Sequence, residues 1–527
     1  MIRRLIRVLS VLVLLALAGA AHALTPELAA RIAAGDSDER IAALGEAVAS
    51  GDAAVAGYIQ ALLGGNVKVA GGKAFVVKGD EVTEAGSGAK ATLPPDAEDV
   101  VNNNRIRREF QAALAGLQLF SKDRATRAAA IERLKGDIDD SKLALLQKAQ
   151  AQESDAGLKA RLDLLMAAAL VGAADPGQRF AAAQRLGQSG EPATASLLID
   201  RIGSEADPKV RSALKIALDN VQGRLAWGER LGVLFAGISL GSILLLVALG
   251  LAITYGLMGV INMAHGELMM IGAYATYVVQ NLFREHLPGA FDWYVIAAIP
   301  ASFAVAALVG AVLERSVIRW LYGRPLETLL ATWGISLVLI QAVRTVFGAQ
   351  NVAVENPSFL SGGIDVLPNL TLPYNRIAVL VFAGLVLALV ALLIGRTRLG
   401  LFVRGVTQNR RMAACVGIDT ARIDTYAFAL GAGIAGMAGC ALSQIGNVGP
   451  DLGQSYIVDS FMVVVVGGVG QLAGAVVAGL GLGVVSKILE GWSGAVLAKI
   501  IVLVLIVVFI QKRPQGLFAL QGRSAEA

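Results

Sequence analysis

Residues 237–280 read GISLGSILLLVALGLAITYGLMGVINMAHGELMMIGAYATYVVQ. The run is long enough to cross a bilayer and turn back, because one helical crossing takes about 20 apolar residues. Its middle carries Asn262, His265 and Glu267. Ionisable groups at that depth are costly and tend to face a protein interior or a water-filled path. We therefore expect a membrane protein in which these groups line or gate a solute path, or else fix a helix kink by hydrogen bonds.

Composition supports a membrane protein with a second, polar domain. Of 527 residues, 55% are hydrophobic and 17% are charged, whereas soluble domains carry about 25% charge. The sequence predicts an all-α chain, with an exported helical domain at 24–230 and a membrane domain at 231–511 of about eight to ten membrane helices. The net charge of +5 is small, and the positive residues cluster near membrane ends. This argues for contact with membrane lipid and against a nucleic-acid partner.

The first 23 residues have the pattern of a secretory signal peptide. Three arginines precede the apolar run 9–18, and Ala-His-Ala at 21–23 fits the small-residue cleavage rule. We expect Leu24 to be the first mature residue; the alternative is an uncleaved anchor. Both readings export the domain that follows.

The exported domain repeats one local pattern, in which an acidic turn is followed by a basic residue and then by Ala and Leu at helical spacing. The four segments are 36–44, 123–130, 175–183 and 206–214. They resemble degenerate HEAT-type helical repeats, with an ordinary alanine-rich bundle as the alternative. Short β-like runs and turn residues within 66–93 predict a small hairpin between helices.

Charge in the loops predicts the orientation of the membrane domain. The loop 396–424 holds six Arg against two Asp, whereas 348–374 contains no Lys or Arg. By the positive-inside rule the first loop is cytoplasmic and the second lies outside. The tail 512–527 is then cytoplasmic, in agreement with an exported N-terminal domain and a multi-pass protein of a bacterial inner membrane.

Several chemistries are disfavoured. The chain lacks the G-x-x-x-x-G-K-[ST] phosphate loop, so any ATP-driven step needs another subunit. His265 and Glu267 have no evident nucleophile beside them, and we expect no enzyme activity. With three histidines and two cysteines in the whole chain, we expect no metal site and no cofactor. Cys415 and Cys440 should be free thiols.

The cytoplasmic stretch 398–419, RLGLFVRGVTQNRRMAACVGID, is basic, with glycine turns around a helical middle. Such a segment suits contact with a soluble partner, and the alternative is positive-inside charge without a partner.

Two stretches carry a family resemblance. The core ALGLAITYGLMGVINMAHGE at 248–267 and the segment 404–419 resemble the permease subunits of ABC importers of the branched-chain amino acid type. The resemblance implies that 396–424 is the coupling loop that docks into an ATPase subunit. The usual Arg-Ala pair reads Arg404-Gly405 here. The coupling residues implied are Arg404, Asn409, Arg410, Arg411, Ala414 and Gly417.

The exported domain and the loop 351–363 are similar to the urea-specific branch of that family. This implies a urea importer with two ATP-binding cassette ATPases, a second related permease and a periplasmic solute-binding protein. Open alternatives are a permease for branched-chain amino acids or short amides, and a non-transport scaffold that presents the repeats. A neutral solute favours amide and hydroxyl partners, whereas a zwitterion favours charged ones. The candidate path residues are Asn262, His265, Glu267, Thr332, Gln444, Asn447 and Asp459.

Overall fold

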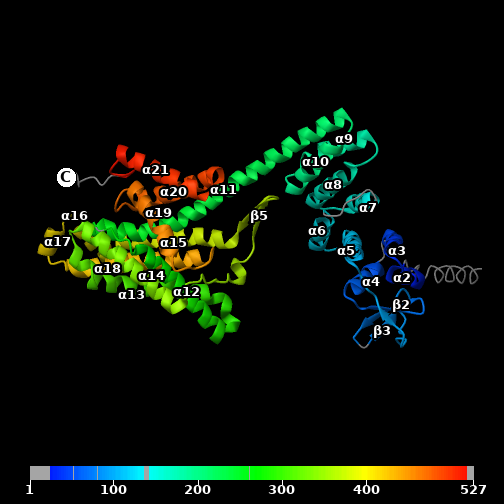
Figure 1. The fold of residues 1–527 in the computed structure, drawn as a ribbon, viewed down its shortest axis with the longest axis horizontal. Coiled ribbons are helices and arrows are strands. Elements are labelled where there is room, and N and C mark those ends of the chain that lie inside the picture. Colours follow the sequence, from blue (N-terminus) through cyan, green and yellow to red (C-terminus); the bar gives the residue numbers. More distant parts are fainter. Residues whose placement is uncertain (1–23, 51–52, 80, 136–141, 260, 519–527) are drawn as a thin grey trace, which may run out of the picture. The chain divides into compact units, whose positions relative to one another are not determined.

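The computed structural model describes residues 24–50, 53–79, 81–135, 142–259 and 261–518. The predicted signal peptide and the last nine residues of the predicted tail lie outside the described residues. The chain divides into two compact units, one up to Leu225 and one from Ala226 (Figure 1). The predicted mostly helical fold is confirmed in both units.

The first unit is built from short helices and one small antiparallel sheet in the order β3-β2-β1-β4. The predicted hairpin is confirmed as β1 and β2, and the structure adds two strands to it. Gly71 and Gly72 form its turn with φ of 56° and 73°, a conformation that favours glycine. The elements are α2 (Pro26–Ala33), α3 (Ser37–Ser50), α4 (Ala53–Leu63), β1 (Val67–Ala70), β2 (Lys73–Lys78), β3 (Glu81–Glu84), β4 (Glu98–Asp99), α5 (Asn104–Gln118), α6 (Arg124–Leu134), α7 (Leu143–Gln152), α8 (Ala156–Leu170), α9 (Pro176–Leu186), α10 (Pro192–Ser204) and the start of α11 (Pro208–Met258).

Three helices form a repeated block in this unit. Helices α6 and α9 begin 52 residues apart, at Arg124 and Pro176, and so do α8 and α11, at Ala156 and Pro208. Asp side chains cap the first turns at matching positions of both blocks, because their oxygens accept free backbone N–H groups there. Of the four predicted segments, 123–130 and 175–183 lie at the starts of the two blocks and 206–214 at the start of α11, whereas 36–44 lies outside the 52-residue spacing. The repeating unit is three helices long.

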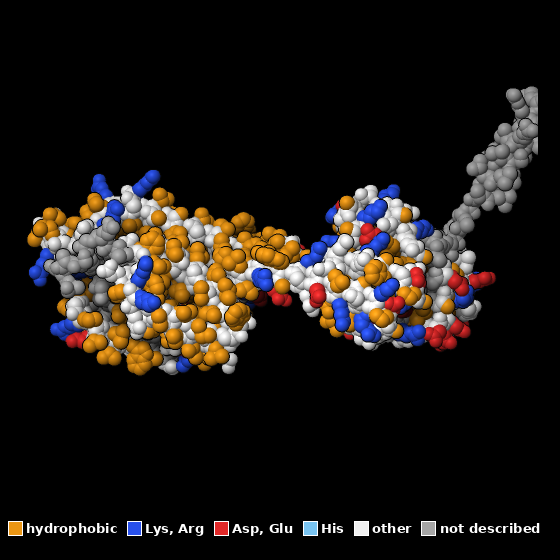
Figure 2. Space-filling model, turned by 90° about the horizontal axis from the view of Figure 1, so that it is seen from above, with side chains coloured by type: hydrophobic (Ala, Val, Ile, Leu, Met, Phe, Trp, Pro, Cys, Tyr) orange, Lys and Arg blue, Asp and Glu red, His pale blue; other side chains and the backbone are white. Residues whose placement is uncertain are grey.

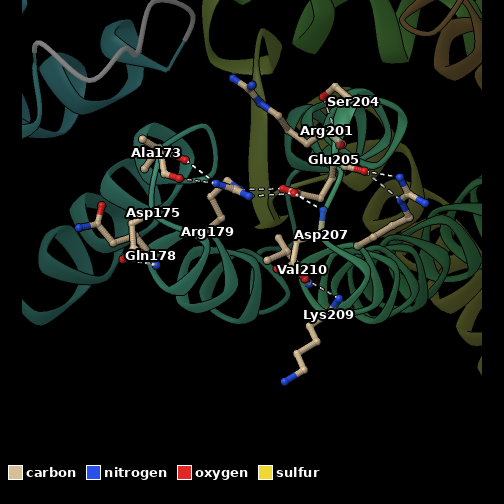
Figure 3. A network of polar contacts seen from close by, with 12 residues as sticks. Ala173, Asp175, Gln178, Arg179, Arg201, Ser204, Glu205, Asp207, Lys209 and Val210 are labelled. Atoms are coloured by element: carbon tan, nitrogen blue, oxygen red, sulfur yellow. Dashed lines mark hydrogen bonds and ion pairs between the residues drawn. The ribbon is translucent and has the colours of Figure 1, made fainter.

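Each block is tied by the same pair of side chains. The Arg127 guanidinium donates to both Glu153 carboxylate oxygens, over 2.8 and 3.0 Å, and to the Ser121 and Lys122 carbonyls. Arg179 repeats this with Glu205 at 2.8 and 2.9 Å (Figure 3). The Glu205 side chain is only 6% exposed. Each arginine thus neutralises a shielded carboxylate and satisfies carbonyls of the preceding turn.

We predict that Arg127→Ala and Arg179→Ala lower the thermal stability of the first unit, because each leaves a shielded carboxylate unpaired. Arg124→Ala is the matched control, since its pair with Asp155 is 66% exposed on the arginine side. The measurement is the temperature at which heating makes residues 120–210 of the solubilised chain sensitive to protease. Equal shifts in all three variants would contradict the prediction.

Acid should remove this stabilisation. Hydrogen bonds from arginine hold the pKa of Glu153 and Glu205 below their usual range, and the bond from Arg124 lowers the pKa of Asp155 to about 2. Carboxylates with a lowered folded-state pKa stabilise the fold above their unfolded pKa of about 4 and lose that contribution as pH falls. The difference in the temperature of protease sensitivity between wild type and Arg179→Ala should therefore become smaller below about pH 4.

The second unit is a helical bundle with an apolar surface. Among the described residues seven helices are long and apolar enough to cross a membrane, fewer than the eight to ten predicted. The apolar helix α19 is shorter than these, and α12 packs against α13, α18 and α19 within the unit. Hydrophobic side chains cover most of the face of this unit that Figure 2 shows, whereas charged ones are scattered over the first unit. The elements after α11 are α12 (His265–His286), η2 (Pro288–Trp293), α13 (Tyr294–Ser316), η3 (Ile318–Leu321), α14 (Pro325–Phe347), η4 (Ser358–Leu360), β5 (Gly363–Leu367), β6 (Leu370–Pro373), α15 (Tyr374–Arg396), α16 (Arg398–Gln408), α17 (Arg410–Cys415), α18 (Thr420–Ser443), α19 (Leu452–Gly467), α20 (Leu472–Ser493) and α21 (Ala495–Lys512).

The predicted helix break at Gly467–Gly470 is present between α19 and α20. Gly468 and Gly470 have φ of 100° and 75°, and the C-terminal segment covers the break. Leu517 N donates to the Val466 carbonyl over 2.8 Å. Backbone groups freed at a helix end need such partners in a membrane protein.

Candidate functional site

The polar segment singled out in the sequence lies where one helix ends and the next begins. Helix α11 ends at Met258 and α12 begins at His265. The Asn262 side chain accepts the Ala264 N–H over 3.0 Å, and the Thr332 hydroxyl of α14 accepts the Met263 N–H over 3.1 Å. Two backbone donors that precede α12 are therefore already satisfied by neutral side chains.

Glu267 lies in the first turn of α12 and is 1% exposed. Its Oε1 accepts a hydrogen bond from the Ser336 hydroxyl over 2.9 Å. His265 is fully buried, with Nε2 3.3 Å from the Val247 carbonyl oxygen. In Asn262, His265 and Glu267 together, three polar atoms have no hydrogen-bond partner among the described residues: Asn262 Nδ2, His265 Nδ1 and Glu267 Oε2.

Unpartnered buried polar atoms are rare because each costs free energy, about 1–3 kcal/mol. Three of them within six residues mark this segment as a candidate site for a hydrogen-bonding solute. We call Asn262, His265, Glu267, Thr332 and Ser336 the polar cluster.

The other predicted path residues lie elsewhere in the fold. Gln444 bonds the Tyr294 hydroxyl over 3.2 Å, and Asn447 is exposed after α18. Asp459 pairs with Lys499 over 3.5 Å beside a cavity of about 260 Å³. The structure thus gathers four of the seven predicted residues into the polar cluster and leaves these three apart.

Ser336 was missed by sequence reasoning. It lies one helical turn after Thr332, so both hydroxyls share one face of α14. Two hydroxyls four residues apart in an apolar run were the available signal.

The helices around the polar cluster pack through glycine. A Cβ on Gly439 of α18 would lie 2.0 Å from the Met269 carbonyl oxygen of α12, and one on Gly266 would lie 2.5 Å from the Gly453 carbonyl oxygen of α19. Such backbone contacts are typical of membrane helices, where small residues permit close approach.

The predicted coupling loop consists of α16 and α17. Arg404, Asn409, Arg411, Ala414 and Gly417 are exposed in it. Two apolar side chains are exposed beside them, Met412 (61%) in α17 and Val416 (70%) directly after it. These seven residues form a basic surface with an apolar part, which we call the α17 surface.

Arg410 differs from the other predicted coupling residues. Its guanidinium bonds both carboxylate oxygens of Asp424 in α18, whose side chain is fully buried. Arg410 is therefore anchored to α18 while its side chain stays 41% exposed, and its role in ATPase coupling stays a prediction.

Residues 233–510 match the family model described as the permease component of branched-chain amino acid transport systems. The chain belongs to this permease family.

Relatives extend the match over nearly their whole length. The high-affinity branched-chain amino acid transport system permease protein BraD of Pseudomonas aeruginosa is 30% identical over 53% of this chain and 93% of its own. The permease protein LivH of the corresponding system in Escherichia coli is 28% identical over 54% of this chain and 94% of its own. The probable LivH of Methanocaldococcus jannaschii is 25% identical. No solved structure matches the chain.

These relatives are transport permeases and not enzymes, as expected for this chain. The permease is a multi-pass membrane protein with an additional N-terminal unit outside the matched residues. Both cysteines are free, as predicted; Cys440 is buried and Cys415 is exposed.

We predict that Gly439→Ala destabilises the permease by about 1–3 kcal/mol, because the added methyl group overpacks the α12–α18 contact. Gly481→Ala in α20 is the matched control, since its added Cβ would meet nothing within 4 Å. The measurement is the thermal unfolding of the detergent-solubilised permease. Equal unfolding temperatures for the two variants would show that the contact tolerates a side chain.

Proposed function

We propose that this permease is the membrane-spanning subunit of an ATP-driven importer and that it carries urea inward. The observation that supports urea best is the chemistry of the polar cluster. Its hydrogen bonds come from an amide, an imidazole, two hydroxyls and one carboxylate, and none of the residues bonded there is Lys or Arg. Urea is neutral and rich in donors and acceptors, so such a set suits it.

A zwitterionic solute is a poorer match to this cluster. Its carboxylate needs a cation or free N–H groups at a helix N-terminus. The Met263 and Ala264 N–H groups are already bonded to Thr332 and Asn262. The resemblance of the exported domain and of the loop 351–363 to the urea-specific branch also supports urea.

Branched-chain amino acids are the second candidate substrate. The relatives of this permease carry branched-chain amino acid transport in their names, and these names favour this candidate over urea.

In both cases the proposed assembly is the same. A periplasmic binding protein delivers the solute, a second related permease completes the path, and two ATPases act on the α17 surface from the cytoplasm. The binding of partners shifts the permease between two conformations. The exported unit is periplasmic and the C-terminus cytoplasmic, as the loop charges indicate.

We predict that a strain lacking this gene loses uptake of labelled urea and keeps uptake of labelled leucine. Complementation with the intact gene should restore urea uptake, and Asn262→Leu should not, because it removes the amide from the polar cluster. Uptake of both solutes is measured at equal amounts of permease in the membrane. Loss of leucine uptake with intact urea uptake would favour the second candidate.

We predict that Met412→Glu and Val416→Glu each lower the amount of ATPase that co-purifies with the permease, because a charge replaces an apolar contact at the α17 surface. Val366→Glu is the control, since Val366 is also about half exposed (52%) but lies in the predicted outer loop. If all three variants retain the ATPases equally, docking does not use these side chains.

A further inference from the structure

Two fully buried acids lie near the predicted cytoplasmic loop of the second unit, and neither is among the predicted site residues. Glu314 is in the last turn of α13, and Asp424 is in the second turn of α18. An unpaired buried carboxylate is strongly destabilising. Each acid is accordingly paired with one arginine, Glu314 with Arg319 over 3.5 Å and Asp424 with Arg410.

Tyr322 joins the two pairs. Its hydroxyl donates to Glu314 Oε1 over 3.0 Å and lies 2.9 Å from the Met258 sulfur at the end of α11. The Arg410 guanidinium lies 5.1 Å from the centre of the Tyr322 ring, within cation–π distance.

Thr425 adds a second connection. Its hydroxyl lies 2.6 Å from Glu314 Oε2 and therefore links α18 directly to α13. We call Glu314, Arg319, Tyr322, Arg410, Asp424 and Thr425 the ion cluster.

Arg410 is the only member of the ion cluster that belongs to α17. One planar side chain donates to the carboxylate of α18 and covers the ring of Tyr322, which in turn contacts the ends of α11 and α13. Lysine offers neither the forked pair of donors nor a flat face. The contact is therefore specific to arginine at this position.

Two helices that meet at the ion cluster, α11 and α18, also pack against the start of α12, which carries part of the polar cluster. A Cβ on Gly250 of α11 would lie 2.4 Å from the Gly431 carbonyl oxygen of α18 and 3.0 Å from His265 Nε2. Helix α18 in addition packs along α12 and α13. A displacement of α18 cannot leave the start of α12 untouched, because these backbones are in direct contact.

We propose that Arg410 is a positioning residue that fastens α17 to α18 and Tyr322, so that movement of α17 by the ATPases reaches the polar cluster. The proposal rests on the proposed ATP-driven import but not on the identity of the solute. It separates two roles within the coupling loop: the α17 surface binds the ATPases, and Arg410 transmits their movement.

The test uses the permease co-purified with its ATPases and partner permease. Hydrogen exchange of peptides that cover residues 261–270 is compared with and without ATP and vanadate, and urea and leucine uptake are measured in vesicles of the same preparations. In the intact complex nucleotide should change the exchange of these peptides. In Arg410→Met this response should fall at least about fivefold, the lower end of typical coupling factors, while the ATPases stay bound.

Two further variants separate transmission from folding. Arg410→Met with Asp424→Asn leaves no unpaired buried charge, so the double variant should fold but still lack the nucleotide response. Arg411→Gln is the matched neighbour, because Arg411 is exposed on the α17 surface. It should reduce the amount of bound ATPase and leave the response of each assembled complex intact.

The outcomes are distinct. A double variant with a wild-type nucleotide response would overturn the proposal, because Arg410 would then serve only to neutralise Asp424. Loss of bound ATPase in Arg410→Met equal to that in Arg411→Gln would also overturn it. The wild-type complex could also respond normally to nucleotide in hydrogen exchange but transport neither urea nor leucine. That result would contradict the proposed substrates, and loss of the response in Arg410→Met would still support the role of Arg410.

Discussion

The membrane unit depends on backbone-to-backbone packing of α12, α18 and α19. In a bilayer the tails are as apolar as leucine, so helices associate through close contact and hydrogen bonds. Gly439 and Gly266 let the backbones approach until no side chain fits between them. This proximity places the start of α12 inside the bundle, where Asn262, His265 and Glu267 are screened from lipid and can face only protein or a solute path.

Polar groups in this unit fall into two kinds. At the polar cluster, neutral side chains and one carboxylate leave three atoms without a hydrogen-bond partner in the described part of the chain. At the ion cluster, by contrast, each buried acid meets an arginine. Unpaired groups suit transient binding, whereas pairs of opposite charge suit a permanent mechanical connection between helices. The fold thus keeps solute contact and helix attachment on different helices of the same bundle.

Local patterns predicted much of the structure. Apolar runs placed the membrane helices, glycines placed the break after α19, and the polar run placed the start of α12. Partners on different helices were not predictable, because local patterns in a sequence do not indicate which helix faces which. Ser336 beside Glu267 and Asp424 beside Arg410 are of this kind. The lone acids Glu314 and Asp424 at the ends of apolar runs were the visible trace of the ion cluster.

The 52-residue spacing in the first unit has a consequence for how the repeat passes into the permease along the chain. The first block ends with α8, and the corresponding helix of the second block is the beginning of α11. That helix continues without interruption to Met258 and becomes the first span of the permease. No turn separates the last helix of the second block from the first apolar helix of the permease. One helix therefore serves both as the closing helix of the repeat and as a candidate membrane span.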